Sequence, residues 1–249
     1  MKMFKILVIF FVLLTQISFA QEKEFPTKHK FDIEGGILRP HKNMIGDDKF
    51  GDRINFLAIQ NKTSPYYRLS YYYQMDEKNS FRVLYAPLSI GGNGAMQNDA
   101  TYQNNQFNGG QDASYQYTFN SYRLTYARTL FQDDKLTFKF GITGKIRNAS
   151  VKLTQGDTQS YESSLGFVPL LYYHLTYRFS PKIFFTSEAD FAYSKMGRAT
   201  DISFALNYDI NRNFDIGAGY RMLEGGAINN KVYTMALINY GFVRLGMKI

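Results

Sequence analysis

Apolar and polar residues alternate one by one over most of the chain, and this period of two constrains the fold more than any other feature. In the stretch 202–210, for example, one parity is apolar and the other is small or polar: Ile202, Phe204, Leu206, Tyr208 and Ile210 against Ser203, Ala205, Asn207 and Asp209. Successive side chains of a β-strand point to opposite faces, so such a strand has one apolar and one polar face. The pattern predicts an all-β fold.

Two kinds of connection separate the alternating stretches. One kind is short and polar, and the other is longer and more variable; the short ones are 76–79, 132–135, 180–182 and 211–213. Reading between them predicts ten strands, at 30–39, 66–75, 80–90, 115–131, 136–154, 161–179, 183–193, 200–210, 214–224 and 231–249. Short turns at one end and long loops at the other are typical of outer-membrane barrels. Residues 50–60 fit a further strand, a plug or a loop, so eight or twelve strands remain open.

Alternation alone does not say which face of the strands lies inside. A soluble, lipocalin-like barrel would turn its apolar face inward. The 20 Tyr and 22 Phe favour the inverted arrangement, because many of them crowd strand ends beside the short turns, where a membrane barrel carries an aromatic girdle. The sequence therefore predicts a single antiparallel up-and-down transmembrane β-barrel, with the soluble barrel as the alternative.

The first twenty residues have the three parts of a secretory signal peptide. Lys2 and Lys5 precede the apolar run 6–14, and Ser18-Phe19-Ala20 places small residues before a cleavage site. We expect cleavage before Gln21, leaving residues 21–249 as a barrel domain in the outer membrane of a Gram-negative bacterium. The chain has no cysteine, so no disulfide framework is expected.

The polar face carries both signs of charge and is predicted to line the lumen. The expected lumen charge network, to which Asp32 and Glu34 also belong, comprises Arg68, Arg82, Arg123, Lys139, Lys145, Arg147, His174, Arg178, Glu188, Asp190, Asp209, Asp215, Arg221 and Arg244. Isolated buried charge is costly, so these groups are expected to pair and close the lumen. The excess of Arg and Lys leaves open a narrow, porin-like pathway for a small anionic solute.

Net charge points to membrane partners rather than to nucleic acid. Removing Lys2 and Lys5 lowers the formal net charge from +8 to +6. In an exported protein, the expected partners of a basic surface are outer-membrane lipid and lipopolysaccharide, with no nucleic acid. No cofactor and no metal site are expected.

The sequence contains no recognisable catalytic set, so an enzymatic function is the less favoured interpretation. His41 and Glu224 are the candidates for chemistry at the outer rim, where a surface enzyme would act on lipid A or peptides. Gly225 and Gly226 are expected to form a rim turn, and Glu224 is expected either to cap that turn or to hold the rim charge network through Arg221. A general base needs a nucleophile within about 3 Å, and no motif fixes such a pair here.

The C-terminal third resembles a set of bacterial outer-membrane β-barrel proteins of unassigned function. The residues that carry the resemblance are Gly219-Tyr220-Arg221-Met222-Leu223-Glu224-Gly225-Gly226, followed by Val232-Tyr233. The resemblance implies the barrel and its location, and it transfers no catalytic or ligand residue. Members of that set commonly end in an aromatic residue, whereas this chain ends in Ile249. We therefore expect the barrel insertion machinery to recognise Tyr240 and Phe242.

Overall fold

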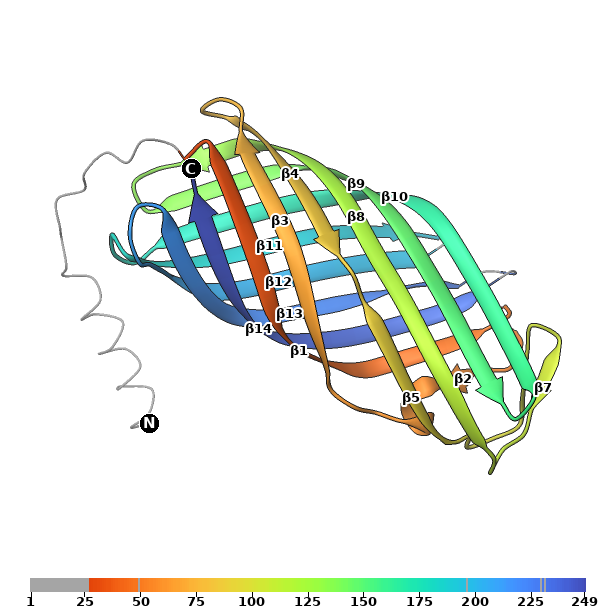
Figure 1. Cartoon of the computed structure of the whole chain (residues 1–249). Coiled ribbons are helices and arrows are strands. Elements are labelled where there is room, and N and C mark those ends of the chain that lie inside the picture. The colour runs from red at the N-terminus through yellow and green to blue at the C-terminus, as the bar shows by residue number, and fades with distance from the viewer. Residues whose placement is uncertain (1–26, 49, 196, 229, 231) are drawn as a thin grey trace, which may run out of the picture.

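The computed structural model describes residues 27–48, 50–195, 197–228, 230 and 232–249. Their strands form a closed antiparallel barrel of ten strands, which confirms the predicted fold class (Figure 1). Each strand pairs with its neighbour in sequence, and the last strand pairs with the first to close the wall. The expected signal peptide and its cleavage site lie outside the described residues.

Most wall strands lie within five residues of their predicted bounds, but the first strand continues seven residues beyond its predicted end at residue 39. In chain order they are β1 (His29–Gly46), β3 (Ser64–Gln74), β4 (Asn79–Ala86) continued by β5 (Ser89–Ala95), β8 (Asp112–Gln132), β9 (Leu136–Gln155), β10 (Thr158–Arg178), β11 (Ile183–Ser194), β12 (Gly197–Asp209), β13 (Phe214–Ile228) and β14 (Tyr233–Lys248). β4 and β5 both pair with β8, so they act as one wall strand interrupted at residues 87–88. No helix among the described residues is long and apolar enough to cross a membrane.

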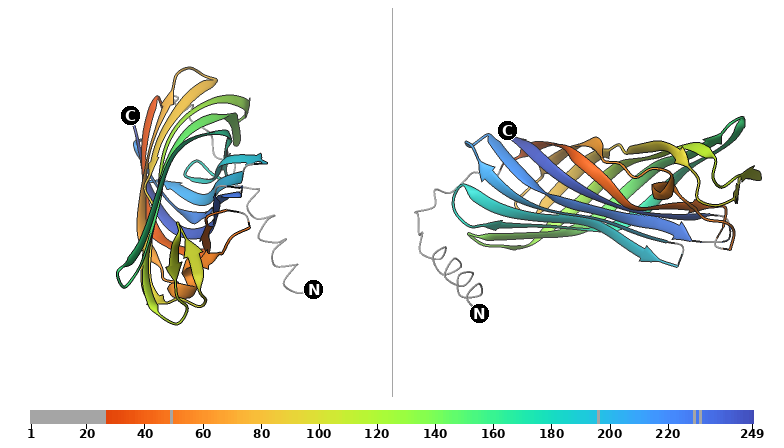
Figure 2. Two further views of the ribbon diagram at one scale, coloured as in Figure 1. Left: turned by 90° about the vertical axis from the view of Figure 1, so that its right-hand side faces the viewer. Right: turned by 90° about the horizontal axis from the view of Figure 1, so that it is seen from below.

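The short turns all lie at the end of the barrel where the chain terminates (Figures 1 and 2). We call this the short-turn end and the opposite one the long-loop end. Each turn is held by one side-chain oxygen that accepts backbone N–H groups two or three residues ahead; the four acceptors are Asp76, Asp133, Ser180 and Asn211. Such Asx- and Ser-type turns explain why these short segments reverse the chain.

In the half nearer the short turns, the wall has its apolar side chains outside and its polar side chains inside. Leu124 in β8 is 58% exposed on the outer face, whereas its neighbour Arg123 is buried. Ile142 in β9 is 63% exposed in the same way, beside the buried Thr143. This is the arrangement of a barrel that faces lipid and the reverse of a soluble, lipocalin-like barrel.

Toward the long-loop end the polarity of the two faces is exchanged. In β8, Tyr115 and Tyr117 point inward and are buried, while Gln116 is exposed on the outside. The alternation continues without a break, but aromatic residues now occupy the inner face. The half of the barrel toward the long-loop end therefore has an apolar interior and a polar exterior, as a water-soluble barrel does.

Residues 50–60 add no strand to the wall; Phe50 is exposed, but Ile54, Phe56 and Ile59 are buried in this apolar interior. The segment forms the two-residue strand β2 (Ile54–Asn55) and the single-turn helix α2 (Phe56–Ile59). The ring of Phe56 stacks on that of Tyr115, with the centroids 4.4 Å apart. The hairpin of β6 (Ala100–Tyr102) and β7 (Asn105–Phe107) adds further buried aromatic side chains to the cluster. We call this cluster the apolar cap.

The lipid-facing surface predicts the effect of a charge placed on it. Ile142 lies six residues above the start of β9. At about 3.3 Å per residue and a strand tilt of about 40°, its height is roughly 15 Å within an apolar outer band that is about 25 Å tall. Ile142→Arg should therefore lower the free energy of unfolding by about 2–4 kcal/mol, as measured by urea titration in lipid vesicles. Gln116→Arg, on the polar exterior, should change it by less than about 0.5 kcal/mol. Equal effects would contradict the proposed position of the lipid band.

The turns predict a measurable electrostatic effect. Hydrogen bonds from the Asn79 side chain and from the Lys78 and Asn79 N–H groups hold the pKa of Asp76 below its usual range. A lowered pKa stabilises the fold above the pKa of the unfolded chain, and this contribution disappears as the pH falls through the folded pKa. Asn79→Ala should raise the pKa of Asp76, as followed by NMR titration.

Asp133 provides the control for that experiment. The N–H groups of Leu136 and Lys135 lower its pKa in the same way, with no contribution from Asn79. Its titration should be unchanged in the Asn79→Ala variant, and an unchanged pKa at Asp76 would refute the assigned cause.

Candidate functional site: the charged lumen and the outer rim

A chain of alternating charges crosses the lumen from one wall to the other. Arg82 of β4 donates from Nη1 to Glu188 Oε1 and from Nη2 to both carboxylate oxygens of Asp190, at 2.8 and 2.7 Å. Arg123 of β8 donates from Nη1 to Asp190 Oδ2 at 2.6 Å. Glu188 and Asp190 both come from β11, so this part of the chain joins opposite sides of the barrel.

Asp201 of β12 continues the chain and lies at its most connected point. Its carboxylate accepts from three arginines: Arg68 at 3.0 Å, Arg123 at 2.7 Å and Arg221 at 2.7 Å. Arg221 also binds Glu34 in a two-pronged contact, from Nε at 3.0 Å and from Nη2 at 2.8 Å. All five side chains are buried. A cavity of about 10 Å³, the size of one water molecule, lies beside Arg68, Arg123 and Asp201.

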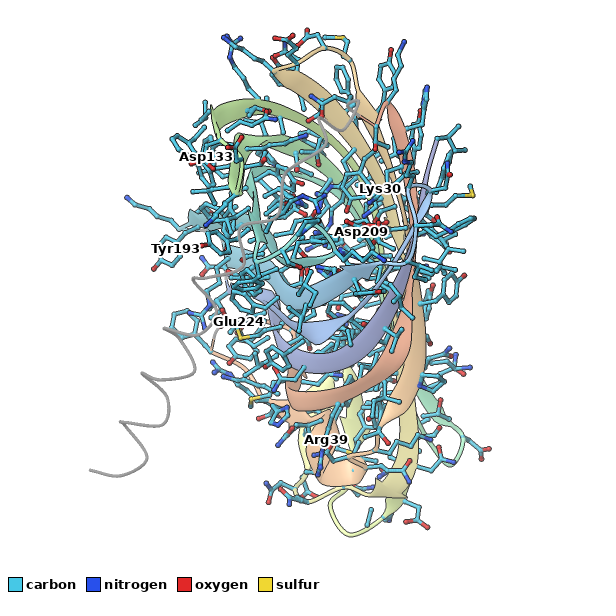
Figure 3. The ribbon with its side chains drawn as sticks, turned by 90° about the vertical axis from the view of Figure 1, so that its left-hand side faces the viewer. Lys30, Arg39, Asp133, Tyr193, Asp209 and Glu224 are labelled. Atoms are coloured by element: carbon cyan, nitrogen blue, oxygen red, sulfur yellow. The ribbon has the colours of Figure 1, made fainter. Side chains whose placement is uncertain are left out.

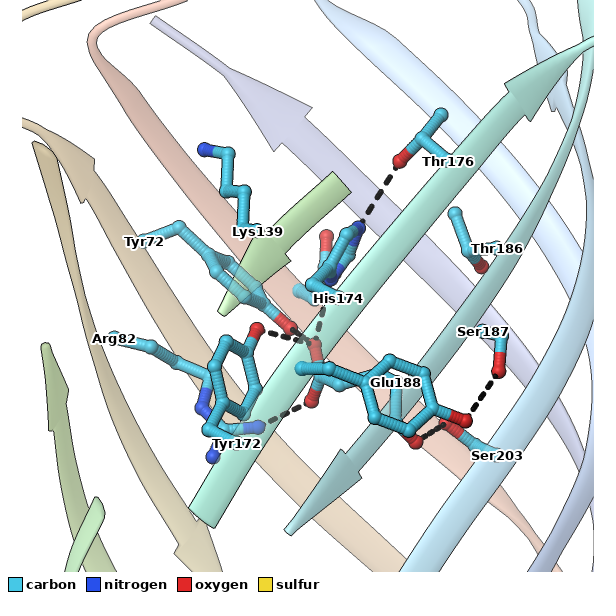
Figure 4. A network of polar contacts seen from close by, with 12 residues as sticks. Tyr72, Arg82, Lys139, Tyr172, His174, Thr176, Thr186, Ser187, Glu188 and Ser203 are labelled. Carbon is cyan, nitrogen blue, oxygen red and sulfur yellow. Dashed lines mark hydrogen bonds and ion pairs between the residues drawn. The ribbon is translucent and has the colours of Figure 1, made fainter. Parts of the chain in front are cut away.

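Glu188 is the meeting point of a second set of hydrogen bonds. The hydroxyls of Tyr72 and Tyr172 each donate to its Oε2 at 3.1 Å, and Nδ1 of His174 lies 3.0 Å from the same oxygen (Figure 4). His174 Nε2 lies 3.1 Å from Thr176 Oγ1. The imidazole is thus held in place on both sides, inside the lumen and far from the outer rim.

A lower tier of charges fills the lumen near the short turns. Lys30 lies 3.1 Å from both Asp32 and Asp215, and Lys248 is paired with Asp209. Arg178 pairs with Asp209 at 2.9 Å, and Arg244 lies 3.6 Å from Asp32. Viewed from this end, Lys30 and Asp209 lie among the side chains that occupy the interior (Figure 3).

Three predicted lumen cations have no acid within ion-pair distance among the described residues. Lys139 is satisfied by Gln74, whose Oε1 accepts from its ammonium at 2.6 Å. Lys145 makes no such bond; its ammonium lies 4.7 Å from the ring centroid of Phe119. Arg147 donates from Nη2 to Ser164 Oγ at 2.9 Å, while its buried Nε has no hydrogen-bond partner.

The predicted set of lumen residues omits Asp201, the carboxylate that pairs with three arginines. Asp201 has the same parity as Ser203 and Asp209, so extending the alternation by one step would have found it. Lys248 has the same parity as Arg244 in the last strand and is likewise absent from the predicted set. The tyrosines that bind Glu188 carried no signal, because Tyr72 and Tyr172 each sit among other tyrosines whose rings face outward.

The two rim candidates lie apart from any catalytic set. His41 lies within β1 and not in a loop, and its Nδ1 is 2.9 Å from the amide nitrogen of Asn239. Glu224 is paired with Arg198 on the outer face, so the expected link to Arg221 is wrong. Gly225 and Gly226 lie inside β13 and not in a turn. The described residues hold no cluster of His, Asp and Glu that could bind a metal ion.

The long-loop end also carries a shallow groove of about 740 Å³ on its outer surface. Polar residues and glycines line it, among them Lys62, Ser89, Gly92 and Lys152. It lies where β3 and β5 are not paired with each other, and the α2 segment packs against β5 there: Gln60 Oε1 accepts from the backbone N–H of Asn93 at 3.2 Å.

Comparison with known proteins identifies the fold only. Protein-family models and curated sequences give no match. Among solved structures, the outer membrane protease OmpT from Escherichia coli is similar with a TM-score of 0.54 and 13% identity, over 95% of this chain and 100% of that one. Ail, the attachment invasion locus protein of Yersinia pestis, gives a TM-score of 0.40 at 9% identity, over 89% and 99% of the two chains. Neisserial surface protein A gives 0.39 at 13%, over 89% and 97%.

The ion-pair chain predicts a large cost for removing its central carboxylate. Asp201→Asn leaves Arg68, Arg123 and Arg221 short of negative charge in a buried site, which should lower the free energy of unfolding by about 3–5 kcal/mol. Glu224→Gln breaks an ion pair at the surface and should cost at most about 1 kcal/mol. Urea titration of both variants in lipid vesicles measures the difference, and similar costs would show that the central chain is not needed for stability.

Proposed function

We propose that the protein is an outer-membrane β-barrel that does not conduct solutes through its lumen and acts at its long-loop end. It would be exported with cleavage before Gln21, inserted by the barrel machinery and surrounded by lipid and lipopolysaccharide. The apolar outer band and the likeness to an outer-membrane barrel support this location. The observation that carries the proposal is the chain of ion pairs across the lumen.

The ion pairs favour a closed lumen over the pathway for a small anion. A pathway for anions needs cations that are free to exchange partners, but Arg68, Arg82, Arg123 and Arg221 each bind at least one carboxylate. Separating a buried pair costs several kcal/mol per charge. An ion that entered from either end would have to break these contacts to pass.

The apolar cap supports the same conclusion from the other end. Phe56, Tyr102 and Phe107 are fully buried above the charged tier. An ion would therefore meet a packed aromatic layer first and a paired charged layer second. The aromatic layer and the ion-paired layer both block the lumen. The outer surface of the long-loop end, with its groove and exposed strands, is then the part of the molecule that can bind a partner.

Planar-bilayer recording tests the proposal directly. The wild-type protein should insert without producing ion steps, with insertion shown by co-flotation with vesicles and by heat-modifiable migration on gels. A variant with Arg82, Arg123, Asp190 and Asp201 all replaced by Ser removes both signs together and serves as the matched control, in which small conductance steps are expected. Regular ion steps from the wild-type protein would overturn the proposal.

A further inference from the structure

The barrel wall is incomplete between β10 and β11. Their pairing ends at Leu171 and Phe191, whereas β10 stays paired with β9 as far as Thr158. Residues 158–170 of β10 thus have no strand partner on the β11 side among the parts of the chain that are described. β9 and β10 extend beyond the ends of β11 and β12 (Figure 1). We call this opening the β10 seam.

The sequence of β10 is suited to an open edge. Arg178 donates its N–H to Lys135 on the β9 side, so the odd-numbered residues of β10 direct their N–H and C=O groups toward the seam. Pro169 is the odd-numbered residue just above the last β11 pair, and it has no N–H to leave unsatisfied. Proline within a sheet is confined to such edge positions.

The height of the seam places it at the outer face of the membrane. Ten residues separate Phe167 from Tyr177, which lies beside the short turns. At about 3.3 Å per residue and a tilt of about 40°, Phe167 is roughly 25 Å above Tyr177, the height of the apolar band. Phe167 is 70% exposed and Leu165 is 75% exposed on the outer face there. Unpaired backbone is tolerated at this level, because the head-group region is wet and the hydrocarbon is not.

Two lumen cations that have no acid partner among the described residues lie on β9, the strand next to β10. Lys145 of β9 is opposite Val168 of β10, and Arg147 is opposite Gly166. Lys145 is 3% exposed, yet neither its ammonium nor the Arg147 guanidinium is paired with an acid of the described chain. A buried cation without a counter-charge is costly, so Lys145, with the partly exposed Arg147 on the same face of β9, indicates a place for an anion.

The Arg147 guanidinium lies close to Gly166 of β10. A Cβ on Gly166 would lie 3.2 Å from Nη2 of Arg147, so a large side chain at this position would have to displace the guanidinium. Ser164 Oγ accepts from Nη2, and Nε remains without a partner. The Arg147 guanidinium and the Lys145 ammonium come from the same face of β9, and both are groups that bind the oxygens of a phosphate.

We propose that Lys145 and Arg147 bind a phosphate group on the head group of an outer-leaflet glycolipid, which reaches them sideways through the β10 seam. The acyl chains of that lipid would lie along the apolar surface at Leu165 and Phe167. The proposal depends on the membrane location proposed above but not on the closed lumen, so lipid binding and conductance can fail separately.

Native mass spectrometry of the folded protein in detergent tests the proposal with three probes: bisphosphorylated lipid A, the same glycolipid without phosphates, and inorganic phosphate. The wild-type protein should retain the phosphorylated glycolipid. The Lys145→Met/Arg147→Gln variant should bind it on the order of tenfold more weakly or worse, as expected for lost charge-assisted hydrogen bonds. Arg128→Gln, at an exposed position of β8 near the short turns, should bind it like the wild type.

A second variant separates geometry from charge. Gly166→Leu keeps both cations but displaces the Arg147 side chain, and it should also weaken binding; heat-modifiable migration confirms that each variant is folded. Equal binding by the double variant and the wild type, or equal binding of the phosphate-free glycolipid, would overturn the proposal. Displacement of the glycolipid by an equal concentration of inorganic phosphate would show that the free anion is the ligand and would overturn its lipid part.

Discussion

Buried charge that must be neutralised within the lumen is the constraint on which the rest of this barrel depends. Asp201 receives three arginines from three different strands, and Arg82 and Arg123 share Asp190. The contacts of Arg68, Arg82 and Arg123 require the opposite wall to be at the correct distance and register, whereas Arg221 reaches Asp201 from the neighbouring strand. The ion pairs therefore restrict the shape of the barrel cross-section as well as its permeability, because a wall that moved outward would leave charges unpaired in a site with little water.

The same wall encloses two interiors of different chemistry. Toward the short turns, the inner face is ionic and the outer face is apolar. Toward the loops, Tyr115 and Tyr117 turn inward and Gln116 turns outward. The exchange occurs within single continuous strands, so no domain boundary marks it. The outer face of one sheet is thus suited to lipid over one stretch and to water over the next. The apolar cap inside the second stretch can pack as the core of a soluble protein does.

The periodicity of the sequence was sufficient to predict the wall, because every strand crosses an environment that differs on its two sides. The short turns were predictable for a similar reason: Asp76, Asp133, Ser180 and Asn211 act on neighbouring residues and need no long-range contact. Partners in the lumen could be predicted as a set but not as pairs, since Arg221 and Glu34 are 187 residues apart in the chain. The seam was not predictable, because it depends on where two strands diverge; β10 has the same alternation with and without a partner.

The order in which the wall closes has a kinetic consequence. Most neighbouring strands are joined by hairpins, but β1 pairs with β14, from Lys30 with Lys248 to Gly46 with Tyr233. Nearly the whole chain must therefore be present before the first strand can meet its partner. Until then, one side of β1 has no strand to bond with, and contacts so distant in sequence form slowly. The edge of β1 thus stays open until β14 has folded against it, and closure is the step most exposed to pairing with a wrong strand.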